Sequence, residues 1–195
     1  MHQKLAKLVS LLTNPALVVS VSVVMILSRY ADTAEKFWQG SVIGIGLLVL
    51  PGIIYSIYIW RKEGAVDLDL TERHDRIVPL MLSTLGAVIG SFLVQSKLQN
   101  ATFTEMSYIL VTMLAALTVV TTVWKISLHA ATIAGLSSLL VVYQGVWFVL
   151  GYLVLIPVIW SRLELKQHSP KQLMAGTILG AGLTLVAAWF FSHYR

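Results

Sequence analysis

The stretch SLHAATIAGLSSLLVVYQGVWFVLGYLVLIPVIW, from Ser127 to Trp160, contains no Asp, Glu, Lys or Arg. A helix needs about 20 mostly apolar residues to cross the hydrocarbon core of a membrane. The stretch holds two candidate spans, over residues 128–144 and 146–160, which are joined only by YQGV around Gly145. It therefore predicts a tight hairpin of two membrane helices.

The same pattern recurs along the rest of the chain, with five more candidate spans over residues 14–30, 40–60, 77–96, 104–123 and 173–191. The chain is 57% hydrophobic and 12% charged, whereas soluble domains average roughly 45–50% apolar and about 25% charged residues. We expect an all-α protein, a polytopic transmembrane helical bundle of six to seven spans, and one domain over residues 1–195. The N-terminal helix is expected to be retained, and Pro51 and Pro157 to kink their spans.

Composition also excludes several kinds of chemistry. The chain has no cysteine, which rules out disulfides, thiolate nucleophiles and cysteine–zinc sites. Its basic residues are scattered and form no basic run interleaved with aromatic residues, so nucleic acid is not an expected partner. No metal-ligand spacing is present, and we expect neither a metal nor a cofactor. Membrane lipids, acidic headgroups included, are the expected surroundings.

The polar residues gather in alternate connections between the spans. Residues 61–76, 125–129 and 161–172 follow the second, fourth and sixth spans, so all three connections are expected on one side of the membrane. They hold His74, His129 and His168. The connections expected on the other side of the membrane are short and contain no recognisable functional motif. The pattern predicts a polar site at one membrane face.

The segment SRLELKQHSPKQ, residues 161–172, has the clearest chemical pattern. Arg162 is followed after five residues by His168, and Ser169-Pro170 is typical of a helix start, since serine is a good N-cap and proline suits the first helical position. A helix N-terminus favours an anion. An arginine nearby suits bidentate binding of phosphate.

Three short motifs together resemble the type-2 phosphatidic acid phosphatases. The spacing SR-x5-H at 161–168 is similar to that family's third motif, SLH at 127–129 to its second, and RHDRIVP at 73–79 loosely to its first. The resemblance covers about residues 61–190, the core that carries the motifs. It implies a metal-independent integral membrane phosphatase that acts through a phosphohistidine.

The resemblance also implies a role for individual residues. His168 would be the nucleophile, and His129 the general acid that protonates the leaving alkoxide. Arg162, Arg76 and the hydroxyl of Ser127 would hold the phosphoryl oxygens. A neutral imidazole is a competent nucleophile near pH 7, and phosphoryl transfer depends mainly on positioning and charge stabilisation.

The chain departs from the family where the third motif ends. The family has an aspartate that orients the nucleophilic histidine, and this chain has Gln172. Its amide oxygen can accept a hydrogen bond but carries no charge, and Glu164 is a candidate substitute. Gln172 also fits a capping box with Ser169, and the sequence leaves capping and orientation of His168 equally open.

The first motif departs further. Asp69 stands where the family has a lysine, and Pro79 is not adjacent to Arg76. Arg73 or Lys125 is expected to supply the missing cation.

Each motif also has a structural interpretation without chemistry. KISLH is compatible with an ordinary interfacial helix start in which Lys125 extends to the surface. RHDR is compatible with a solvated loop of self-paired charges. Arg162 and His168 are compatible with merely interfacial residues.

The sequence thus favours an enzyme that hydrolyses a lipid phosphate or a polyprenyl diphosphate. The alternative is a catalytically inactive component that binds or transports phospholipid on the same scaffold. Ten Lys or Arg residues fall on the motif side of the spans and four on the other. The positive-inside rule then favours the cytoplasmic face for the motifs. Four of the ten, Arg73, Arg76, Lys125 and Arg162, are also candidates for binding phosphate, and without them the count is six to four, so the outer face stays open as the alternative. A cell membrane is the expected location.

Overall fold

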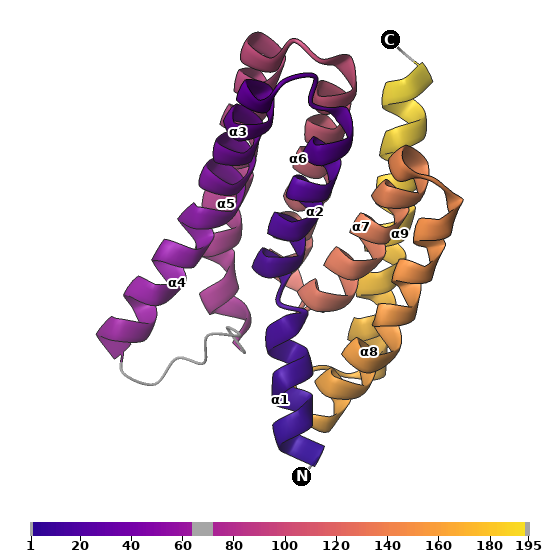
Figure 1. The fold of residues 1–195 in the computed structure, drawn as a ribbon. Coiled ribbons are helices and arrows are strands. Elements are labelled where there is room, and N and C mark those ends of the chain that lie inside the picture. The colour runs from indigo at the N-terminus through magenta and orange to yellow at the C-terminus, as the bar shows by residue number, and fades with distance from the viewer. Residues whose placement is uncertain (1, 64–71, 194–195) are drawn as a thin grey trace. The chain divides into compact units, whose positions relative to one another are not determined.

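The computed structural model describes residues 2–63 and 72–193, and every regular element in these ranges is a helix (Figure 1). Asp69, where the resemblance expects a lysine, lies outside the described residues. The elements along the chain are α1 (His2–Leu12), α2 (Pro15–Tyr30), α3 (Ala34–Ile43), η1 (Gly44–Val49), α4 (Leu50–Glu63), α5 (Arg73–Leu93), η2 (Val94–Leu98), α6 (Ala101–Val123), α7 (Leu128–Gln144), η3 (Val146–Val154), α8 (Leu155–Glu164) and α9 (Pro170–His193).

Five continuous helical stretches in the described residues are long and apolar enough to cross a membrane. α1 and α2 together pass the same test but are bent by 42° at their junction, and α7 is apolar but only 17 residues long. The predicted all-α, polytopic fold is confirmed, with five candidate spans in the described residues, or six if α1 and α2 form one bent span. The predicted span over residues 128–144 is the shorter helix α7. In the described part of the chain, the continuous candidates for spans are Ala34–Ile59, Arg73–Leu98, Ala101–Val123, Val146–Glu164 and Pro170–His193.

The α-helical hydrogen-bond pattern changes just before two prolines. Residues 44–49, ahead of Pro51, form the π-helix η1, and residues 146–154, ahead of Pro157, form the 3-10 helix η3. A proline has no N–H to donate and its ring displaces the carbonyl four residues earlier. A local change to π or 3-10 geometry is a common way to accommodate such a break in a membrane helix.

The chain divides into two compact units. The first holds Met1–Ser22 and Ile126–Tyr194, and the second holds Val23–Lys125. The expectation of one domain over residues 1–195 stays a prediction.

The first unit is organised by α7 and α9, which pack along each other (Figure 1). Gly176 faces Ser127 and, four residues further along both helices, Gly180 faces Ala131, so the two helices run parallel. A Cβ atom on Gly176 would lie 2.6 Å from the carbonyl oxygen of Ser127. Small residues that let two helix backbones approach this closely drive helix association in membranes.

The predicted hairpin is present in the first unit. Gly145 ends α7 with φ 122°, a backbone conformation that favours glycine, and η3 packs back on α7. Gly151 approaches Ser137 there, and the hydroxyls of Ser138 and Tyr152 are hydrogen-bonded. The apolar core beside the hairpin consists of Ala130, Ile133, Ala134, Leu155, Val158 and Leu173.

The second unit is built around α5, which packs on η1, α4 and α6. Gly86 of α5 leaves room for the carbonyl of Leu47. In an α-helix this carbonyl would accept a hydrogen bond from the N–H of residue 51, but residue 51 is a proline and has no N–H. Between α5 and α6, the hydroxyls of Thr84 and Thr118 are hydrogen-bonded at 2.8 Å, a polar contact of the kind that joins helices in membranes.

We expect Gly180→Ala to destabilise the protein by about 1–3 kcal/mol, because the new Cβ meets the backbone of Ala131 and forces α7 and α9 apart. Gly182→Ala is the matched control on the same helix, since no atom lies within 4 Å of its added Cβ. Thermal unfolding in detergent measures both. Equal melting temperatures for the two variants would contradict the close packing.

Candidate functional site

The start of α9 is fixed by a reciprocal cap. The backbone N–H of Gln172 donates to the Ser169 hydroxyl at 3.4 Å, and the backbone N–H of Ser169 donates to the Gln172 side-chain oxygen Oε1 at 3.0 Å. This is the capping box that the sequence indicated. It determines where the chain entering α9 lies, and therefore where His168 lies.

The same oxygen of Gln172 also contacts His168, whose Nδ1 lies 3.3 Å from Oε1. A backbone N–H can only donate, so the atom facing Ser169 must be the amide oxygen. That oxygen accepts from His168 only if Nδ1 carries the proton, which leaves Nε2 as the basic atom of a neutral ring. Gln172 thus has both of the contacts that the sequence left open.

The turn before α9 folds His168 back towards the end of α8. Lys166 has a positive φ of 53°, and the backbone N–H of Gln167 donates to the carbonyl of Arg162 at 3.1 Å. Because of this turn, the five residues between Arg162 and His168 form a compact reversal rather than an extended loop.

The start of α7 lies beside the start of α9. The backbone N–H of Ser127 donates to the Gln172 carbonyl at 3.3 Å, and the Ser127 hydroxyl caps α7 by accepting from the backbone N–H of Ala130 at 3.4 Å. The hydroxyl proposed for phosphate therefore serves as an N-cap here, and its own proton remains available to donate.

Ser10 of α1 joins two of the predicted site residues. Its hydroxyl accepts a hydrogen bond from Nη1 of Arg162, and its backbone carbonyl lies 3.2 Å from Nε2 of His129. A carbonyl can only accept, so this contact favours the forms of His129 that carry a proton on Nε2. Nearby, the hydroxyl of Ser161 donates to the carbonyl of Ala6 at 2.7 Å. Sequence reasoning missed Ser10, which is 119 and 152 residues away from its two partners.

Ser10 thus links Arg162 and His129, while the turn after α8 and the cap of α9 position His168. These three residues, His129, Arg162 and His168, are called the cationic cluster here. Their exposed fractions are 4%, 0% and 6%. Two helix N-termini lie beside them, each the positive end of a helix dipole. The first unit as a whole holds five Lys or Arg residues and a single acidic residue, Glu164. The cluster is therefore suited to an anion rather than to a metal cation.

The other predicted site residues are placed differently. Glu164, the candidate substitute for aspartate, ends α8 half-buried, and Gln172 is the residue that contacts His168. Arg73, Arg76 and Lys125 belong to the second unit, and their part in binding phosphate stays a prediction.

Within the second unit, Arg73 caps a helix. Its guanidinium donates to the carbonyls of Thr121 and Thr122 at the end of α6, where a cation complements the helix dipole. Arg76 is buried in α5. In the described residues, no group of three or more His, Cys, Asp or Glu side chains is placed to hold a metal ion.

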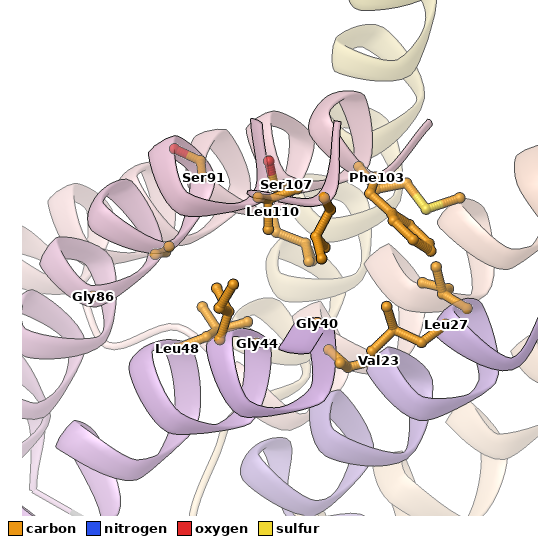
Figure 2. A pocket seen from close by; sticks show the side chains of 17 residues that line it. Val23, Leu27, Gly40, Gly44, Leu48, Gly86, Ser91, Phe103, Ser107 and Leu110 are labelled. Atoms are coloured by element: carbon orange, nitrogen blue, oxygen red, sulfur yellow. The ribbon is translucent and has the colours of Figure 1, made fainter. Parts of the chain in front are cut away.

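The second unit also contains an apolar cavity, lined by residues of α2, α3, η1, α5, η2 and α6 (Figure 2). Glycines 40, 44, 86 and 90 open the space between these helices. The two hydroxyls in its wall, Ser91 and Ser107, donate to carbonyls of their own helices. The wall of the cavity is therefore apolar, and the cavity suits an apolar chain rather than a phosphate.

Comparison of the chain with protein-family models, with curated proteins and with solved structures finds no match.

We expect Gln172→Ala to lower the free energy of unfolding by about 1 kcal/mol, because the cap of α9 and the bond to His168 are both lost. Gln172→Glu is the matched control, since a carboxylate still accepts from Ser169 and should keep the stability of the wild type. Thermal unfolding in detergent measures both. A Gln172→Ala protein as stable as the wild type would exclude a capping role.

Proposed function

We propose that this multi-pass membrane protein is a lipid phosphatase that hydrolyses the phosphomonoester or diphosphate of a lipid or polyprenyl substrate through a phosphohistidine. The observation that carries the proposal is the pair of contacts that orient the two buried histidines. Nδ1 of His168 faces the amide oxygen of Gln172, which leaves Nε2 as the atom to act as nucleophile, and Nε2 of His129 faces the carbonyl of Ser10, where a protonated nitrogen is favoured. The motif resemblance supports the same assignment.

In the first step, Nε2 of His168 attacks the phosphorus atom. A P–N bond forms while the bond from phosphorus to the lipid oxygen breaks. Arg162 stabilises the non-bridging oxygens, which carry the charge of the transition state. His129 enters this step as the imidazolium, gives its Nε2 proton to the leaving alkoxide and becomes neutral.

In the second step, water hydrolyses the phosphohistidine. His129, now neutral at Nε2, accepts a proton from the attacking water. A P–O bond forms, the P–N bond breaks, and inorganic phosphate leaves while His168 returns to its starting state. The amide oxygen of Gln172 keeps the His168 ring oriented throughout, since its cap to Ser169 fixes the amide.

A lipid substrate is supported by the position of the cluster at the ends of membrane-length helices. An apolar chain can lie among such helices while the phosphate meets the polar ends. We further propose a cell-membrane location with the site on the cytoplasmic side, which the ten-to-four excess of Lys and Arg on the motif side supports.

The alternative is a protein that binds or transports phospholipid without hydrolysing it. Gln172 favours this alternative, because a neutral amide brings no charge to stabilise the imidazolium that forms when His168 reacts. The same cationic cluster would then serve for headgroup binding alone.

The deciding experiment is phosphate release by detergent-purified protein from phosphatidic acid, phosphatidylglycerophosphate and prenyl diphosphates. We expect release from at least one of them, inhibition by vanadate, and a loss of at least about 10³-fold in His168→Ala. His129→Ala should lose about 10²–10⁴-fold, as expected for general acid catalysis.

His193→Ala is the matched control, because His193 is an exposed histidine at the other end of α9, and it should keep full activity. Undiminished turnover in purified His168→Ala would exclude the mechanism. Headgroup binding without any phosphate release would favour the transport alternative.

We also expect Gln172→Glu to raise turnover roughly tenfold, because a carboxylate at this position stabilises the imidazolium that develops on His168. The comparison is the rate constant of wild type and variant on the same substrate at the same pH. An unchanged or lower rate would show that charge at position 172 does not limit the reaction.

A further inference from the structure

We infer that Ser10 is an internal plug: it holds the place of the substrate phosphoryl group between Arg162 and His129, and α1 is the lid that carries it. This inference rests on the proposed function. It extends that function to regulation of the site and brings in a helix that none of the three motifs contains.

Ser10 presents hydrogen-bond acceptors to Arg162 and His129. It offers two oxygen atoms, a hydroxyl that accepts from Arg162 and a carbonyl that accepts from Nε2–H of His129. In the proposed reaction the same two donors serve a non-bridging phosphoryl oxygen and the leaving oxygen. In the resting protein Ser10 therefore accepts hydrogen bonds from Arg162 and His129, as the substrate would during the reaction.

The cationic cluster is closed to a substrate in this structure. His129, Arg162 and His168 are each more than nine-tenths buried, so a lipid phosphate reaches them only after some element moves aside. Removal of Ser10 would uncover Arg162 and His129 in one movement, because it contacts both.

The attachment of α1 to the rest of the first unit allows it to move. Its main neighbour in the fold is α8, and its inward residues, Ala6 and Ser10, are small. α2 begins with a cap of its own, since the side chain of Asn14 accepts from the backbone N–H of Ala16 at 3.0 Å. The 42° bend between the two helices thus lies at a junction where α1 can swing while α2 stays folded.

The outer face of α1 suits the surface of a bilayer. Leu5, Leu8, Leu11 and Leu12 are exposed, and Lys4 and Lys7 are exposed on the same short helix. A helix with exposed leucines and lysines binds in the interfacial plane of a membrane. An open α1 therefore has a favourable place to lie, and its leucines need not enter water.

The test is equilibrium binding of orthovanadate, a phosphate-shaped oxyanion, to the full-length protein in detergent. We expect Ser10→Ala to bind vanadate roughly tenfold more tightly or better, because Arg162 no longer has to release a hydroxyl. Ser20→Ala is the matched control, since the Ser20 hydroxyl donates only within its own helix, to Ala16, and it should bind vanadate as the wild type does.

A second variant keeps the test decisive if Ser10→Ala does not fold. The wild-type chain has no cysteine, so Ala6→Cys carries a single thiol in the fully buried contact between α1 and α8. We expect vanadate to speed its labelling by a maleimide at least about fivefold. Leu11→Cys, exposed on the same helix, should label fast with or without vanadate.

The outcomes separate the two proposals. If the wild type binds vanadate but Ser10→Ala binds it equally or more weakly, Ser10 is not a plug, and the phosphatase proposal stands. Vanadate binding with slow labelling of Ala6→Cys throughout would likewise overturn the lid. If neither the wild type nor Ser10→Ala binds vanadate, the phosphate site fails and the plug fails with it.

Discussion

The close parallel contact of α7 and α9 is the constraint on which the first unit depends. Gly176 and Gly180 bring the backbone of α9 against the backbone of α7 at Ser127 and Ala131. This register sets the starts of both helices at one level, where Ser127 donates to the carbonyl of Gln172. Two positive helix ends then point the same way, an arrangement that an anion between them would stabilise.

Much of the fold follows from hydropathy, because membrane helices must be long, apolar and internally hydrogen-bonded. The hairpin at Gly145 and the cap of α9 were also readable, since a short glycine connection and a Ser-x-x-Gln sequence are local signals. The register of α7 on α9 was not, because it depends on which glycines meet a facing backbone. The sequence could not decide whether Gln172 caps α9 or contacts His168. Its side-chain oxygen makes both contacts at once.

The part of the site that sequence reasoning missed comes from α1. Ser10 lies in a short apolar N-terminal helix without a motif, and its partners are more than a hundred residues away in the chain. Nothing local marks such a residue, because its contacts arise only after α1 packs on α8. The contact of Arg73 with the end of α6 was not readable either, because any helix end can offer its carbonyls to a nearby cation. Whether Arg73 or Lys125 binds phosphate stays a prediction.

The length of α7 has a consequence for the bilayer itself. Seventeen residues extend about 26 Å at the usual rise of an α-helix, which is less than the roughly 30 Å of hydrocarbon in a typical membrane. Such hydrophobic mismatch is relieved by local thinning of the bilayer or by a helix end that lies beneath the headgroups. In the first case the headgroups approach the start of α7, and in the second an end of α7 lies below them, so bilayer thickness becomes a variable that affects how this protein meets its lipids.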